Sequence, residues 1–143
     1  MLGGIIGDIV GSIYEASPIK RTDFPLFGAG ATFTDDTVLA VATADVLLHG
    51  GDYARAYRDY ALQHPGRGYG GRFRQWATNE REGAYNSFGN GSAMRAGPIG
   101  WACAGRDAVL SEAERSASVT HNHPEGIRGA QAVLIVTPDA APH

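Results

Sequence analysis

The sequence predicts an all-α protein, and three observations support this fold class. Apolar residues recur at the spacing of one helix face: Tyr53, Ala56, Tyr57, Tyr60 and Ala61. Residues that favour helix starts and stops flank most segments with such spacing. Strand signals are sparse, since the clearest candidate, residues 133–136, fits the end of a buried helix equally well.

The first predicted helix covers residues 3–15 and carries two rows of residues at helical spacing. One row is glycine at positions 4, 7 and 11, which allows another backbone to approach closely. The other row is polar and consists of Asp8, Ser12 and Glu15. Because each glycine costs roughly 1 kcal/mol in a helix relative to alanine, three of them require a packing or functional reason. We expect a closely packed helix that presents its acids inward.

The second helix begins at the run Thr34-Asp35-Asp36-Thr37. Such side chains compete for backbone groups in a helix interior, but they bind the free N–H groups at a helix start. The same oxygen atoms are the ligands that Mg²⁺ prefers. Two interpretations of this run therefore remain: an ordinary helix cap and a metal site. The apolar helix that follows, residues 38–48, ends at a histidine followed by two glycines.

Further helices are predicted along the middle of the chain. Asp52 caps the helix of the tyrosine face, which ends before Pro65 and is more typical of a core than of a cofactor site. Residues 66–72 are rich in glycine and arginine. Because no strand precedes this segment and its spacing does not match a phosphate-binding loop, we expect a flexible linker. Phe73 and Trp76 begin a short helix that Gly83 ends.

The loop at residues 86–91 leads into a helix that starts near Ser92. The free N–H groups and the positive end of the dipole at a helix start suit a pyrophosphate. An ordinary capped loop is the alternative, because glycine, asparagine and serine are common loop residues. Arg95 lies just inside this helix and can either reach a phosphate or brace the loop.

Two helices are predicted in the C-terminal part of the chain. Asp107 caps the first, whose buried side carries Val109, Leu110, Ala113 and Ala117. The second begins at Pro124, with Asn122 or His123 as its cap. Two nearby histidines suggest zinc, but a zinc site needs further ligands that this segment does not provide.

Four motifs together resemble the ADP-ribosylglycohydrolase family. They are GDIVGSIYE, FTDDT, SFGNGSAMR and THNHPEG, at residues 7–15, 33–37, 87–95 and 120–126, and they occur in the order of that family. The resemblance implies an all-α fold with a binuclear magnesium or manganese centre. This centre holds the ribose of ADP-ribose while the bond to a modified side chain is hydrolysed.

The resemblance also implies roles for particular residues. Thr34, Asp35 and Asp36 would be metal ligands, and Glu15 would be the catalytic carboxylate. Asp8 would support the ligands or pack its helix. The implied substrate-binding residues are one loop, the turn after it and a histidine: Ser87, Phe88, Gly89, Asn90, Gly91, Met94 and His121. Phe88 would stack on sugar or base, and His121 would lie near the ribose or a phosphate.

One part of the family pattern is not found in this sequence. Family members are usually about twice this length, and a downstream Asp-x-Asp-Thr motif completes their metal pair. Here the chain ends in Val133–His143, where prolines at 138 and 142 would stop a helix. We therefore expect a single C-terminally truncated domain over residues 1–143, with an incomplete metal site.

Composition narrows the class of protein and its partners. With 143 residues, of which 43% are apolar, the chain is large enough to bury one core. A formal net charge of −3 argues against a nucleic-acid partner, because no basic stripe is available for phosphates. A single cysteine, Cys103, excludes an internal disulfide. No segment resembles a membrane span or a secretory signal, so we expect a cytoplasmic protein.

Three functional interpretations remain open. The first is a metal-dependent hydrolase that removes ADP-ribose from modified side chains, acting on an N- or O-glycosidic bond of an ADP-ribosylated protein. The second is an ADP-ribose-binding remnant without turnover, and the third is a non-functional chain. Apolar surface left uncovered by missing helices predicts a homo-oligomer or a complementary chain, which would also complete the metal site.

Overall fold

The computed structural model describes residues 1–136. Within this range it contains helices and no strands, which confirms the all-α prediction. In chain order the elements are α1 Leu2–Gly11, the 3₁₀ turn η1 Ser12–Tyr14, α2 Asp35–His49, α3 Tyr53–Gln63, α4 Gly71–Thr78, α5 Gly91–Met94, α6 Ile99–Ala102, α7 Arg106–Ser118 and α8 Pro124–Val136. Residues 133–136 are helical, so the strand alternative is wrong. The helix stop predicted at the two C-terminal prolines lies outside the described residues.

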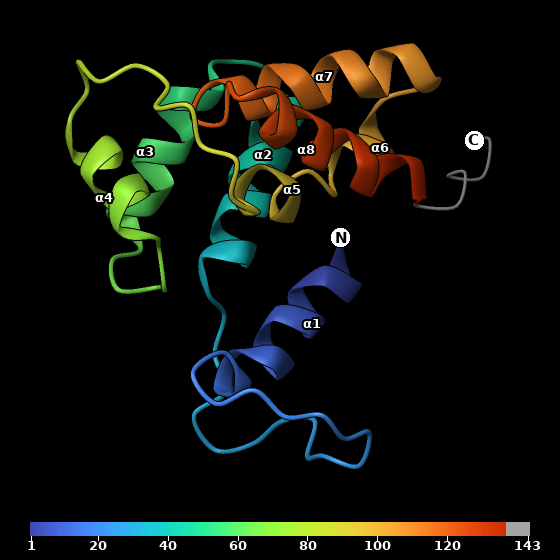
Figure 1. Cartoon of the computed structure of the whole chain (residues 1–143). Coiled ribbons are helices and arrows are strands. Elements are labelled where there is room, and N and C mark those ends of the chain that lie inside the picture. The colour runs from blue at the N-terminus through green and yellow to red at the C-terminus, as the bar shows by residue number, and fades with distance from the viewer. Residues whose placement is uncertain (137–143) are drawn as a thin grey trace.

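Helix α2 lies at the centre of the arrangement (Figure 1). On one side it packs against α3, which in turn contacts α4, and on the other side it contacts α5 and α6. Helices α7 and α8 pack against each other beyond these short helices. Over residues 1–136, none of the helices combines the length and the apolar character that a membrane span requires.

Two clusters of buried side chains form the core. The first joins α2, α3 and α4 and includes Leu39, Tyr57 and Trp76, so the tyrosine face predicted from its spacing is a core face. The second joins α6, α7 and α8 and includes Ile99 and Leu134. The binding residues predicted from the sequence lie between the two clusters, on α5 and the loops beside it.

Several predicted helix ends are confirmed. The helix start predicted at residues 34–37 is found, with Thr34 rather than the acidic pair as the cap, since its side chain accepts a hydrogen bond from the N–H of Asp36 at 3.4 Å. Asp52 caps α3 in the same way through the N–H of Arg55, at 2.8 Å. Helix α2 ends at His49 and is followed by Gly50, whose φ of 77° is a conformation that glycine adopts without strain.

The prediction that Asp107 caps α7 is wrong. Gly105 precedes this helix with a φ of 85°, and Asp107 lies within the first turn. Asp107 retains a favourable position, because a negative charge in the first turn interacts with the positive end of the helix dipole. The helix predicted from Phe73 also ends earlier than expected, at Thr78 rather than at Gly83.

The prediction of a closely packed first helix is also wrong. Helix α1 ends at Gly11 and continues as η1, and none of its residues is buried. No atom lies within 4 Å of a Cβ placed on Gly4, Gly7 or Gly11, so no backbone within residues 1–136 uses the row of glycines. Figure 1 shows α1 beside the start of α2 and apart from α7 and α8. Its attachment to the start of α2 includes hydrogen bonds to the carboxylate of Asp8.

The segment 66–72, expected to be a flexible linker, is attached to the start of α2. The carbonyl of Arg67 accepts a hydrogen bond from the N–H of Asp35 at 2.7 Å. The Arg67 guanidinium lies 3.8 Å from the centre of the Phe33 ring and donates to the Thr32 hydroxyl at 2.9 Å. Helix α4 begins within the segment, at Gly71.

Candidate functional site

The carboxylate of Asp8 holds the start of α2. It accepts hydrogen bonds of 2.5 to 3.2 Å from the N–H and the hydroxyl of both Thr34 and Thr37. These bonds satisfy backbone donors that have no partner within the helix, and they place a negative charge at the positive end of its dipole. Asp8 therefore docks α1 on α2, one of the two roles expected for it.

At the start of α2, Asp35 is half-buried and Asp36 is exposed, and the two neighbouring carboxylates repel each other. Burial, followed by repulsion from Asp36, raises the pKa of Asp35 to about 6. Burial also raises the pKa of Asp36, and the charges of Asp8 and Glu15 raise it further. Carboxylates that repel one another in partial burial favour a bound proton or a cation.

The two acids face different cavities, because neighbouring residues of a helix point about 100° apart. Asp35 lines a pocket of about 260 Å³ between α2, α4, α5 and the loop that carries His121. Asp36 lines a second pocket of about 330 Å³, whose other walls include Ile5, Ala40 and Trp101. The possible metal ligands at the start of α2 therefore do not all face the same pocket.

The pocket at Asp35 gathers most of the predicted substrate-binding residues. Six of the seven line it: Ser87, Gly89, Asn90, Gly91, Met94 and His121. Phe88 does not. Its side chain is 73% exposed, and its ring lies 5.3 Å from the ring of His123.

His121 forms a buried wall of this pocket. Its Nδ1 lies 2.8 Å from the Thr120 hydroxyl. A Cβ placed on Gly91 would lie 3.0 Å from Cε1 and 3.2 Å from Nε2 of the ring, so the glycine makes room for the imidazole. Burial, and then the nearby charge of Arg95, lower the pKa of His121 to about 4. The imidazole is therefore neutral at physiological pH.

A sequence comparison accounts for this combination of residues. The profile of the ADP-ribosylglycohydrolase family matches residues 1–141. The chain belongs to the ADP-ribosylglycohydrolase family. A relative, the ADP-ribosylhydrolase ARH3 of Danio rerio, is 29% identical over an alignment 160 positions long, which covers 91% of this chain and 43% of the relative. The chain thus spans less than half the length of that relative.

ADP-ribosylglycohydrolases are generally metal-dependent, and the start of α2 is the candidate site for the ion. Thr34, Asp35 and Asp36 fit a hard divalent cation in the type of donor atom and in charge. Within residues 1–136, however, no group of three aspartate, glutamate, histidine or cysteine residues is placed to hold a metal ion. Glu15 lies exposed at the end of η1. The donors that fit a metal ion here are thus two neighbouring carboxylates and a threonine hydroxyl, with no third acid, histidine or cysteine grouped with them in residues 1–136.

Arg95 of the family motif braces the loop, which is one of its two expected roles, and it also lines the pocket at Asp35. Its side chain is completely buried and lies 4.0 Å from the centre of the Tyr57 ring. The guanidinium donates to the carbonyl of Ser116 at 2.9 Å and to the hydroxyl of Thr120 at 2.8 Å. These bonds join α5 to the end of α7.

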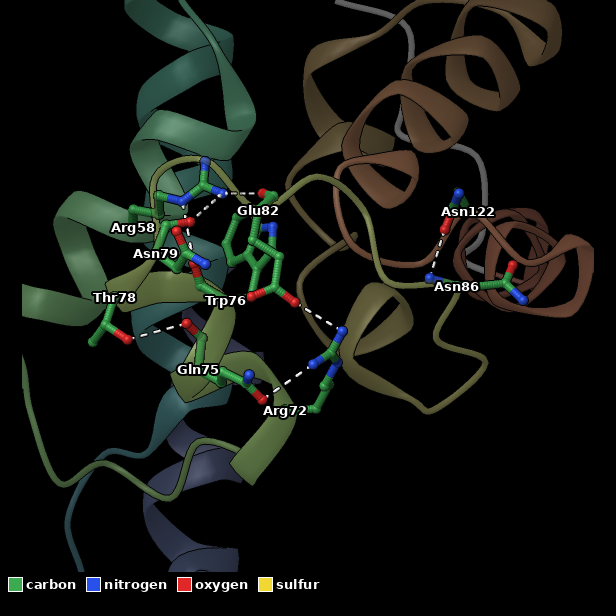
Figure 2. Close-up of polar contacts among 9 residues, drawn as sticks. All are labelled: Arg58, Arg72, Gln75, Trp76, Thr78, Asn79, Glu82, Asn86 and Asn122. Carbon is green, nitrogen blue, oxygen red and sulfur yellow. Dashed lines mark hydrogen bonds and ion pairs between the residues drawn. The ribbon is translucent and has the colours of Figure 1, made fainter.

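The last family motif holds the binding loop from the other side. Ser92 donates its hydroxyl hydrogen to the carbonyl of Gly126 at 2.7 Å. The side chain of His123 accepts from the N–H of Glu125, which confirms it as the cap before Pro124. Asn122, the other candidate cap, instead accepts from the N–H of Asn86 at 2.7 Å (Figure 2).

The loop before the binding residues is also attached to α3 and α4 (Figure 2). Arg58 donates to the carbonyl of Glu82 at 2.7 Å and lies 3.9 Å from the centre of the Trp76 ring. Arg72 forms a 2.7 Å ion pair with the carboxylate of Glu82. Arg72 and Tyr85 line the pocket as well, and the motifs did not indicate either residue.

The low pKa of His121 predicts a pH dependence of stability. Between its ordinary value of 6.5 and about 4, the unfolded chain binds the proton more readily than the folded chain. The contribution of the His121 imidazole to the free energy of unfolding is therefore full above pH 6.5 and is lost as pH falls toward 4. We expect the His121 ring to titrate near pH 4 by NMR and His121→Gln to flatten this part of the stability curve. His49→Gln, at an exposed position, is the control, and a midpoint near 6.5 for His121 would contradict the account.

Proposed function

We propose that this chain is a metal-dependent hydrolase that removes ADP-ribose from modified side chains by cleaving an N- or O-glycosidic bond. The observation that carries the proposal is the convergence of three family motifs on one pocket. Asp35, the loop at residues 87–91 and His121 lie in different parts of the sequence and line the same space. Because the chain belongs to the ADP-ribosylglycohydrolase family, we expect an ADP-ribosylated substrate in this pocket.

The pocket offers two kinds of recognition for ADP-ribose. The first backbone N–H groups of a helix have no partner within it, and those of α5 lie next to the glycine-rich loop, where they suit a pyrophosphate. Thr34, Asp35 and Asp36 are the proposed ligands of Mg²⁺ or Mn²⁺, and of these three Asp35 lines this pocket. When bound, the ion would polarise oxygen atoms of its ligands. Asp35 would thus orient the ribose end of the ligand, and the loop its phosphates.

Glu15 is the proposed proton-handling carboxylate. It ends η1, directly after the helix that Asp8 docks on α2, and its charge acts on both Asp35 and Asp36. A carboxylate beside the reacting bond can take a proton from the attacking water, and such general base catalysis contributes typically 10²–10⁴-fold. Its position therefore depends on the docking of α1.

Binding without turnover is the second candidate function. Two observations favour it: Glu15 is exposed, and residues 1–136 hold no group of three metal-binding side chains. Ligands from a second copy or a complementary chain would restore the hydrolase. The two functions share the pocket and differ in whether the glycosidic bond is broken.

Release of free ADP-ribose from ADP-ribosyl-arginine tests the hydrolase directly. We expect release in the presence of magnesium and none after chelation. Glu15→Gln should abolish release and retain ADP-ribose binding, whereas Glu114→Gln, an exposed glutamate on α7, should change neither. Binding without release by the unmodified chain would favour the second candidate, and absence of both would overturn the proposal.

A further inference from the structure

The imidazole of His121 is the end of a buried chain of hydrogen bonds. Nη2 of Arg95 lies 2.8 Å from Oγ1 of Thr120, and the same oxygen lies 2.8 Å from Nδ1 of His121. Arg95 and Thr120 are completely buried, and His121 is nearly so. Solvent therefore does not compete for these bonds.

Counting protons along this chain determines how the ring is protonated. A guanidinium has only donors, so the Thr120 oxygen accepts from Arg95. The Thr120 hydroxyl has one hydrogen, and among residues 1–136 its only recorded neighbour able to accept it is Nδ1 of His121. If Nδ1 instead carried the hydrogen, the buried hydroxyl hydrogen would lack a partner, at a cost of about 1–3 kcal/mol. Nδ1 is thus the acceptor, and the neutral ring carries its hydrogen on Nε2.

The position of Nε2 makes its hydrogen available to a ligand in the pocket. Nε2 faces the loop that lines the pocket, since a Cβ on Gly91 would lie 3.2 Å from it and a Cβ on Gly89 would lie 4.0 Å from it. Both glycines and the histidine line the pocket at Asp35. An N–H at this place donates toward a ligand that carries acceptor oxygens.

We propose that Thr120, held by Arg95, is a positioning residue that fixes His121 as an Nε2–H donor toward a phosphate oxygen of the bound ligand. The identity of the ligand rests on the proposed function, but the proton position does not. Arg95 has a second effect, because its charge opposes protonation of the neighbouring ring and so keeps the imidazole neutral.

The proton position is measured first in the ligand-free protein. Long-range ¹H–¹⁵N correlation spectra distinguish a ring nitrogen that carries hydrogen from one that does not, and loss of signals in His121→Gln assigns the ring. We expect Nε2 to carry the hydrogen and Nδ1 to accept one, in the unmodified chain and in Thr120→Ser. A hydrogen on Nδ1 in the unmodified chain would overturn the inference, whether or not ADP-ribose binds.

The consequence for binding is measured with ADP-ribose by titration calorimetry. Thr120→Val keeps the side-chain shape and removes the hydroxyl, so the Nδ1 signal should shift and the affinity should fall about tenfold, while Thr120→Ser keeps both. Unchanged Nδ1 signals and affinity in Thr120→Val would contradict the positioning role. If ADP-ribose does not bind the unmodified chain, the proposed function fails, and the spectra of the unmodified chain and Thr120→Ser still decide the proton position.

Discussion

Gly126→Ala is expected to disrupt the binding loop and to destabilise the fold by about 1–3 kcal/mol or more. A Cβ at this position would lie 2.6 Å from the carbonyl oxygen of Ser87 and 2.9 Å from Cβ of His121. Neither neighbour is the free end of a flexible side chain, so α8 and the loop must separate. Urea unfolding measures the loss of stability, and ADP-ribose titration measures the expected loss of affinity.

Gly129→Ala on the same helix is the matched control. No atom lies within 4 Å of a Cβ placed there, and the backbone is helical. Because alanine is favoured over glycine inside a helix by up to about 1 kcal/mol, this variant should be as stable as the unmodified chain or slightly more so. Equal effects of the two substitutions would show that the close approach of α8 to the loop is not what Gly126 provides.

Asp8→Ala is expected to release α1 from the start of α2. The substitution removes an acceptor of four hydrogen bonds, and hydrogen bonds to charged groups contribute about 1.5–3 kcal/mol each without being additive. No residue of α1 is fully buried, so apolar packing replaces little of the lost attachment. Hydrogen exchange of the α1 amides should become fast while α7 and α8 remain protected. Turnover should be lost as well, because Glu15 follows α1.

Asp8→Asn and Asp23→Ala make this experiment specific. The asparagine amide retains one acceptor oxygen and places donors against threonine hydroxyls and backbone N–H groups, so it should behave much like the alanine variant. Asp23 is an exposed acid paired with Arg21, and its loss should leave exchange in α1 unchanged. Protection of α1 that survives Asp8→Ala would mean that contacts other than this carboxylate hold the helix.

Local interactions made much of the fold predictable from the sequence. The helix start at residues 34–37, the cap at Asp52 and the tyrosine face of α3 depend on neighbours a few residues away, and all three are found in the structure. The close packing expected of the glycine row in α1 is not found, because that expectation depended on which segment lies opposite. The attachment of residues 66–72 was missed for the same reason, since Arg67 meets Phe33 and Asp35 only after folding.

The residues of the candidate site were likewise predictable from the sequence only in part. Its motifs indicated the loop, the acidic pair and His121, and the structure brings most of these residues to one pocket. Phe88 lies apart from it, because the loop turns this side chain toward His123 and solvent. Arg72, Tyr85 and Thr120 carried no motif signal that assigned them a role. Their contribution comes from long-range contacts, such as the bond between Thr120 and Arg95.

The dissociation constant of ADP-ribose, measured by titration calorimetry with magnesium and again after chelation, tests the central claim most directly. The account predicts binding to the unmodified chain that weakens at least tenfold without magnesium, a difference of about 1.4 kcal/mol. Asp35→Ala should weaken binding in magnesium to the same extent, and Asp45→Ala, near the other end of α2, should not. Equal affinity in all four measurements, or no binding in any, would contradict a single ADP-ribose site built from the start of α2, the glycine-rich loop and His121.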